Sequence, residues 1–246
     1  MTRRAADAVQ PHYEAILERI RAAPILYVDE TSIDVQGNLH WIWTFTTTSE
    51  TFFVIRKSRG MKALLEVLTR RFKGIIVCDG WKSYAKFTKR LQRCWAHLLR
   101  ESKELAEIIA EADSLHQALK DLFKRLTEAL EIDPPPEVRR ELWQMGRTTL
   151  QQLISKEYVD EKVRKLIGKI RNGFEYWFTF VIHPGVEPTN NRAERSLREQ
   201  VVFRKILGTL RNIKGTSIHE RIMTVLATWG QLGLNCHQML KASLTS

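Results

Sequence analysis

The chain has 246 residues, of which 43% are hydrophobic and 27% charged; this composition excludes a disordered polymer and allows a sizeable core. Its 39 lysines and arginines against 28 acids give a formal charge of +11, which favours a polyanionic partner such as nucleic acid, although charge alone leaves a merely basic globular protein open. Three widely spaced cysteines, no apolar leader and no apolar run near the roughly 18 residues of a membrane span exclude a disulfide scaffold and a membrane protein, and we expect the cytoplasm.

The first part of the chain predicts strands with few helices. A short helix is expected over 12–22 and ends at Pro24, within an N-terminal helical segment, 1–24. β-Branched and aromatic residues predict a three-stranded meander at 25–35, 39–47 and 51–57. Helical spacing follows over 61–72, and "IIVC", 75–78, is typical of a strand buried on both faces. The stretch "QRCWAHLL", 92–99, predicts a strand that passes into a helix.

The second part predicts helices. Leucines recur at helical spacing over 115–130, "DPPPE" ends that helix, and two more helical segments are expected up to about 172. The aromatic run "FEYWFTF", 174–180, is better explained by packing within these helices than by base stacking. Further helices are expected over 190–206 and 218–229. The whole pattern indicates an α/β sheet covered by helices and interrupted by a long helical block.

Three carboxylates stand out. Asp29 and Asp79 each follow four apolar residues, "ILYV" and "IIVC", so parallel strands would bring both to the same edge of the sheet. For either of them taken alone, a turn or N-cap aspartate after a strand is the favoured explanation. Glu194 lies among three arginines at the start of a helix. With Asn191 as N-cap, Glu194 would be the third helical residue and could complete a capping box.

A cluster of all three carboxylates would point to metal ions. Each close pair of carboxylates costs roughly 4 kcal/mol at an effective dielectric constant near 20, so divalent cations explain such a cluster best. Ligation by oxygen alone selects Mg²⁺ or Mn²⁺. Two such ions, about 3.5–4 Å apart, can activate water and stabilise the leaving oxygen during attack on phosphorus. The arginines around Glu194 would then contact phosphate.

The motifs "YVDET", "VCDGWKSY", "CWAHLLRE" and "NNRAERSLR", in this order, resemble the DDE transposases of the IS66-type insertion-sequence family over about Tyr27 to Leu240. The resemblance implies an RNase H-like α/β fold, a mixed sheet flanked by helices with an α-helical insertion before the last catalytic acid. The core would comprise 25–98 and 181–246, and the insertion 99–180. Asp29, Asp79 and Glu194 would form the catalytic triad and hold two Mg²⁺ or Mn²⁺ ions, which requires their carboxylates to lie within roughly 4–8 Å of one another.

The resemblance also implies an activity and a partner. The enzyme would cleave transposon DNA and transfer the freed strand to target DNA, as a homo-oligomer assembled on DNA. A nuclease that cuts without joining and a non-catalytic DNA-binding remnant are the alternatives. The residues expected to contact DNA are Arg192, Arg195, Arg198, Arg204, Lys205, Arg211 and Lys214.

Three smaller features remain. Cys94 and His97 form a C-x-x-H pair, too few ligands for a structural zinc site; the resemblance places His97 near the catalytic centre, against the alternative of a buried histidine. For Trp81 and Tyr84, packing beside the catalytic strand is favoured over base stacking. About 24 residues precede the first strand, where longer members carry end-recognition segments, so we expect recognition of transposon ends to need more than these residues.

Overall fold

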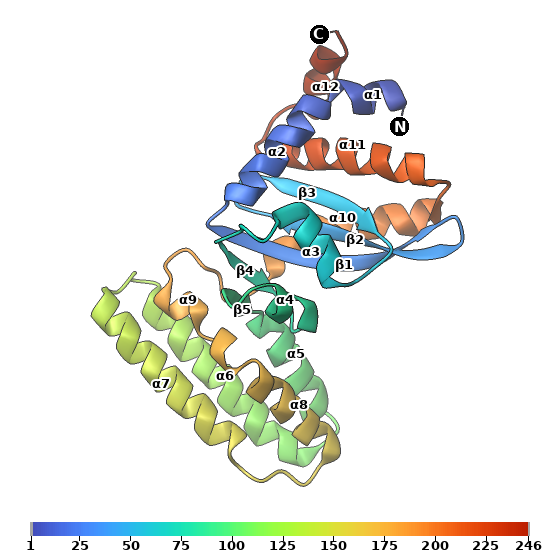
Figure 1. Ribbon diagram of the computed structural model, residues 1–246. Coiled ribbons are helices and arrows are strands. Elements are labelled where there is room, and N and C mark those ends of the chain that lie inside the picture. Colours follow the sequence, from blue (N-terminus) through green and yellow to red (C-terminus); the bar gives the residue numbers. More distant parts are fainter. Residues whose placement is uncertain (1, 246) are drawn as a thin grey trace. The chain divides into compact units, whose positions relative to one another are not determined.

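The computed structural model describes residues 2–245, apart from the side chain of Leu207, and divides the chain into two compact units (Figure 1). Unit 1 contains four of the six strands in full, the first two residues of a fifth, and the first and last helices. Unit 2 is mainly helical. Unit 1 comprises Met1–Ile76, Trp81–Arg90 and Asn190–Ser246, and unit 2 comprises Val77–Gly80 and Leu91–Thr189.

The sheet is mixed, as the sequence predicts. Its hydrogen-bonded order is β3-β2-β1-β4-β5; β1 pairs antiparallel with β2 and β2 with β3, whereas the short β6 pairs parallel with β1. The β1–β2 turn places Gly37 at a φ of +76°, a conformation that glycine adopts without steric cost. The predicted three-stranded meander is therefore confirmed. The strands are β1 Ile25–Val35, β2 Asn38–Thr46, β3 Thr51–Arg56, β4 Ile75–Cys78, β5 Leu91–Arg93 and β6 Thr209–Leu210.

Helices cover both faces of the sheet in unit 1. One face carries an apolar cluster of strand residues that packs under Leu197 of α10 and Met223 of α11. On the other face Tyr13 of α2 contacts Phe52, with ring centroids 4.7 Å apart, and Tyr84 of α4 contacts Trp43. The helices of unit 1 are α1 Arg3–Ala8, α2 Gln10–Ala22, α3 Met61–Leu68, α4 Lys82–Phe87, α10 Asn191–Leu207, α11 Ile213–Gln231 and α12 Cys236–Thr245.

Helix α11 also supplies acceptors to the outer strand β3. The backbone N–H of Phe53 donates to the Thr224 hydroxyl at 2.9 Å, and that of Ile55 donates to the Glu220 carboxylate at 2.7 Å. The N–H of Thr51 donates in the same way to Thr228, so that acceptors one helical turn apart match alternate residues of the strand. The N–H groups that a sheet edge normally exposes are thus hydrogen-bonded inside unit 1.

Unit 2 packs four longer helices around leucines and aromatic rings. The predicted 115–130 helix buries Leu115, Leu119, Leu122 and Leu126, whereas Leu130 is half-buried. Trp95 contacts Trp177 and Phe178, with ring centroids 5.7 and 5.9 Å apart. The "FEYWFTF" run therefore belongs to the core, as predicted, with Trp177, Phe178 and Phe180 buried. The helices are α5 Trp95–Ala106, α6 Ala110–Leu130, α7 Pro136–Ile154, α8 Glu161–Asn172, the 3₁₀ turn Phe174–Tyr176 and α9 Thr179–Ile182.

Some helix boundaries differ from the prediction. The N-terminal segment forms two helices, α1 and α2, instead of the one expected over 12–22. Helix α2 starts earlier than predicted, at Gln10, and holds Pro11 in its first turn, where proline is tolerated. Helix α3 ends at Leu68 rather than near 72, because Thr69 adopts a φ of +60° that stops the helix. Within residues 2–245, no helix combines the length and the apolar character needed to cross a bilayer.

Candidate active site and nucleic-acid interface

Asp29 lies in the middle of β1, on the face of the sheet that α10 covers. It is half-buried, and its Oδ1 accepts a hydrogen bond from the N–H of Glu30 at 2.9 Å. Its partner across the antiparallel pair is Thr44, and side chains of such partners point to the same face. The Thr44 hydroxyl bonds that of Ser196 in α10 at 2.8 Å. Asp29 therefore faces the first two turns of α10.

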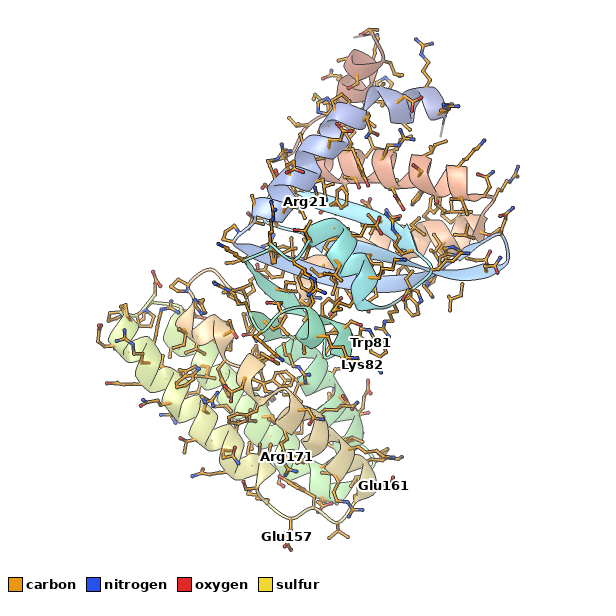
Figure 2. The ribbon with its side chains drawn as sticks, viewed as in Figure 1. Arg21, Trp81, Lys82, Glu157, Glu161 and Arg171 are labelled. Carbon is orange, nitrogen blue, oxygen red and sulfur yellow. The ribbon has the colours of Figure 1, made fainter. Side chains whose placement is uncertain are left out.

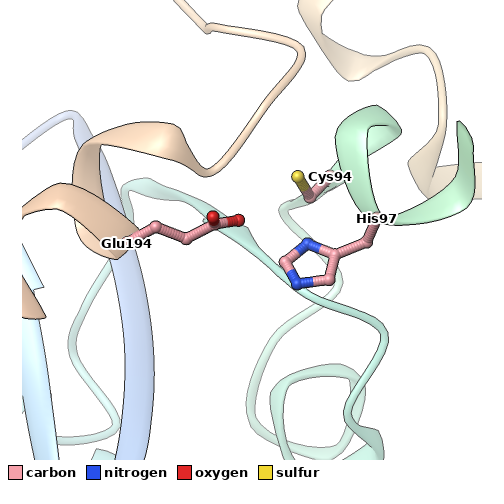
Figure 3. Close-up of side chains that lie close together, drawn as sticks. All are labelled: Cys94, His97 and Glu194. Atoms are coloured by element: carbon pink, nitrogen blue, oxygen red, sulfur yellow. The ribbon is translucent and has the colours of Figure 1, made fainter. Parts of the chain in front are cut away.

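The start of α10 is fixed to the same strand. The side-chain amide of Asn190, which is buried, donates to the carbonyl of Val28 at 3.0 Å, one residue before Asp29. Glu194 follows Asn190 by four residues, and its N–H donates to the Asn190 carbonyl. Residues four apart share a helix face, so Glu194, half-buried, projects from the turn that Asn190 anchors (Figure 3).

The register of α10 does not fit the alternative in which Glu194 only completes a capping box. Asn190, not Asn191, is the N-cap of α10, and its side chain makes no capping hydrogen bond because it is committed to β1. Glu194 is then the fourth helical residue, one position beyond the capping-box site. The sequence "NN" allowed either register, and the tertiary contact with Val28 decides between them.

Asp79 belongs to unit 2, directly after β4, and is half-buried. The residue before it is hydrogen-bonded to the start of α5: the N–H of Cys94 donates to the Cys78 carbonyl at 2.9 Å. Arg93, only 9% exposed, lies beside it: a Cβ on Gly80 would be 3.9 Å from the Arg93 Nη1. Burial lowers the pKa of Arg93, while the neighbouring Cys78 and Asp79 act in the opposite direction.

Cys94 and His97 mark the start of α5 in unit 2. Cys94 is the N-cap residue and buried, and His97 is half-buried in the first turn, one turn along the same side of the helix (Figure 3). Cys78, Cys94 and Cys236 form no disulfide. The positioning role of His97 stays a prediction.

A network around Glu30 was not predicted from the sequence. Its side chain is fully buried on the face opposite Asp29, accepts from Arg59 Nε at 2.6 Å and accepts from the Tyr84 hydroxyl. The Arg59 guanidinium lies 4.4 Å from the ring centroid of Trp81 and 4.9 Å from that of Trp41. Trp81 projects at the start of α4 beside Lys82 (Figure 2). Tyr84 is buried, which bears out its predicted packing role.

The positive charge of the chain belongs entirely to unit 1. Unit 1 holds 24 lysines and arginines against 11 acids, a formal charge of +13, whereas unit 2 holds 15 against 17, a charge of −2. A polyanion is therefore attracted to unit 1. Among the basic residues predicted to contact DNA, those that are exposed are Arg195, Arg198, Lys205, Arg211 and Lys214.

The other two predicted DNA contacts are engaged within unit 1. The Arg192 guanidinium lies over the ring of Tyr27, 5.2 Å from its centroid. Arg204 donates from Nη1 to the hydroxyls of Ser32, at 2.9 Å, and Thr31, and to the Ser32 carbonyl. Both arginines fasten α10 to β1. Next to Arg195, α10, α11, the start of α12 and the ends of β2 and β3 line an open pocket of about 670 Å³.

Comparison with known proteins agrees with the motifs. No curated protein and no solved structure matches the chain. A sequence model of the transposase IS66 family matches residues 1–218, a range that includes β1, β4, α5 and all of α10. Because this match spans well over half of its length, the chain belongs to the IS66 family of transposases.

Proposed function

We propose that the chain is the catalytic part of a DDE transposase, which cuts a phosphodiester at the end of its element and joins the freed 3′ end to target DNA. The observation that carries the proposal lies within unit 1: α10 is anchored to β1 by Asn190, on the face of the sheet that carries Asp29. Glu194 projects from that anchored turn, so two of the three proposed catalytic acids are carried by elements, β1 and α10, that are hydrogen-bonded to each other.

The donor set suits divalent cations. Carboxylate oxygens are the ligands that Mg²⁺ and Mn²⁺ prefer, and Asp29 is already oriented by the N–H of Glu30. We propose that Asp29, Asp79 and Glu194 together hold two such ions. When bound, the ions would lower the pKa of water and stabilise the leaving oxygen. His97 would help to position the reacting groups.

Charge supports the choice of substrate. The +13 charge of unit 1 and the exposed Arg195 and Arg198 on α10 suit a DNA backbone, which is bound mainly through its phosphates. In this proposal residues 25–98 and 181–246 are the RNase H-like core, and residues 99–180, which lie in unit 2, are an insertion before Glu194. A homo-oligomer assembled on DNA would bring two ends together.

The proposal is tested by removing one carboxylate at a time. Asp29→Asn, Asp79→Asn and Glu194→Gln keep the side-chain shape but lose a negative ligand, so Mn²⁺-dependent nicking of an oligonucleotide duplex should fall by several orders of magnitude. DNA binding in a gel shift should be unchanged or slightly tighter, because a charge that repels phosphate is lost. Asp34→Asn is the matched control: this half-buried carboxylate in β1 accepts from the Gly37 N–H, which asparagine can still do.

Each result separates the candidate functions. Strand-transfer products from the wild type support the transposase, and nicking without joining indicates a nuclease. A wild type that binds DNA but never nicks it, with Mg²⁺ or Mn²⁺, indicates a DNA-binding remnant. Variants that nick as fast as the wild type would show that these acids are not the catalytic site.

A further inference from the structure

Arg93 is the best-enclosed arginine near a proposed catalytic acid. It ends the short strand β5 and is 9% exposed. Its Nη1 donates to the Lys169 carbonyl at 3.0 Å, and its guanidinium carbon lies 5.7 Å from the ring centroid of Trp177. Lys169 is in the last turn of α8, whose carbonyls attract cations, and its carbonyl also accepts the N–H of Gly173 at 3.2 Å. One side of the guanidinium is therefore held by the end of α8.

The other side of the guanidinium faces the Asp79–Gly80 turn. A Cβ on Gly80 would lie 3.9 Å from Nη1 and 4.0 Å from Cζ, which is ordinary contact distance. The carboxylate of Asp79 is among the charges that interact with Arg93. All of these groups belong to unit 2. Arg93 thus connects the turn that carries Asp79 to the end of a helix more than seventy residues away in sequence.

Gly173 makes room for this connection. A Cβ at this position would lie 2.1 Å from Nη1 and 2.4 Å from Cζ of Arg93, far inside contact distance. Its backbone φ of −108° is open to any residue, so glycine is needed here for space and not for conformation. An alanine would displace the guanidinium and leave the residue type of Arg93 unchanged.

From these contacts we propose, building on the function proposed above, that Arg93 is a positioning residue that fixes the Asp79 turn against the end of α8. The helical unit then contributes to catalysis by orienting an acid rather than by contacting DNA. Arginine suits this role because its planar fork can donate to the α8 carbonyl and present further N–H groups to the turn. A lysine has only one ammonium group, so it cannot present separate N–H groups to the α8 carbonyl and to the Asp79 turn.

The test uses Arg93→Gln, Arg93→Lys and Gly173→Ala in the full chain. The first readout is hydrogen exchange at the amides of Asp79 and Gly80 without metal, which should become faster in all three variants. The second is the nicking rate as a function of Mn²⁺ concentration. Loss of a residue that orients a metal ligand typically costs about ten- to a hundred-fold in metal affinity or activity, and we expect a loss of this size with unchanged DNA binding.

The matched control is Arg147→Gln. Arg147 is also an arginine of unit 2 stacked on an aromatic ring, 4.6 Å from that of Trp143, but it pairs with Glu175 and not with the Asp79 turn. It should leave both readouts at wild-type values. All assays are run well below each variant's unfolding temperature, and Gly173→Ala substitutes for Arg93→Gln if the latter fails to fold.

The outcomes are distinct from those of the proposed function. Faster exchange confined to Asp79 and Gly80 supports the positioning role even if no nicking is ever seen. Folded variants with wild-type exchange and a wild-type Mn²⁺ dependence overturn it, whatever the activity of Asp79→Asn. Exchange that rises evenly throughout unit 2 also overturns it, because Arg93 would then act only on stability.

Discussion

At the scale of single residues, each of the three proposed catalytic acids lies next to a group that orients it or anchors the turn that carries it. Asp29 is oriented by a backbone N–H, Glu194 projects from a helix turn that Asn190 fastens to β1, and Asp79 lies beside Arg93. The motif spacing singled out these three acids. It gave no sign of Asn190 as an anchor or of Arg93, because both act through partners far away in the chain, and only the folded structure identifies those partners.

One buried residue between α10 and α11 gives the fold a pH dependence. His219 is 1% exposed, its Nε2 bonds the Gln200 side-chain oxygen at 2.8 Å, and its ring centroid lies 4.5 Å from that of Phe203. Burial lowers the pKa of His219 to about 4. In the unfolded chain a histidine has a pKa of about 6.5, so as pH falls the unfolded state binds a proton before the folded state does. The stability of the fold is therefore unaffected by protonation of His219 above about pH 6.5 and decreases as the pH falls from there towards 4.

We therefore expect the free energy of unfolding to fall between pH 7.5 and 4.5, with His219 accounting for about 2–3 kcal/mol of the loss. Urea unfolding of the wild type and His219→Gln at both pH values measures this share as a difference. The comparison cancels the neighbouring Glu220, whose pKa burial raises and whose effect has the opposite sign. An equal loss in both proteins would contradict the assignment to His219.

At the scale of helices and strands, the predictions from sequence patterns agree with the structure where short stretches of sequence determine the element. β-Branched and aromatic residues between turn signals predicted the three strands, and leucine spacing predicted α6, because both are properties of short stretches of sequence. The predictions were wrong at boundaries: Thr69 ends α3 early, and α10 begins at Asn191 with Asn190 as its cap. Those boundaries depend on a left-handed backbone conformation and on a tertiary hydrogen bond, which hydrophobic periodicity does not encode.

The contact between α11 and β3 offers a prediction at this scale. Thr224 is completely buried and its hydroxyl accepts the Phe53 N–H. Thr224→Val keeps the shape but leaves that N–H without an acceptor, which should cost about 1–3 kcal/mol of unfolding free energy. Urea unfolding measures the cost, and exchange of the Phe53 amide locates it. Thr127→Val is the control, since this hydroxyl bonds only carbonyls of its own helix, and an equal loss there would refute the argument.

At the scale of the whole molecule, the two units differ in net charge. Composition alone yields a total formal charge of +11, whereas the fold assigns +13 to unit 1 and −2 to unit 2. No composition argument could make this division, because unit 1 is assembled from three separate stretches of chain. DNA affinity is therefore expected to depend on basic residues of unit 1 and to be insensitive to those of unit 2.

Salt dependence tests this division. Replacing Arg195 and Arg198 by alanine should weaken binding to all DNA sequences and reduce the slope of log affinity against log salt by about 2, since each phosphate contact contributes about 0.9. The control replaces Arg140 and Lys165 of unit 2, whose side chains are 67% and 68% exposed. An unchanged slope for the first pair, or an equal change for both, would show that α10 does not carry the interface.

The hydrogen bonds from β3 to α11 also limit how copies of this chain can associate. A neighbouring molecule that added its own strand to this rim would need the N–H groups of Thr51, Phe53 and Ile55 as donors, and all three are taken. Fibril-like stacking from this side is blocked for the same reason. In the homo-oligomer proposed above, copies would therefore not pair strands through β3, and a mutation that detaches α11 would expose these N–H groups to aggregation.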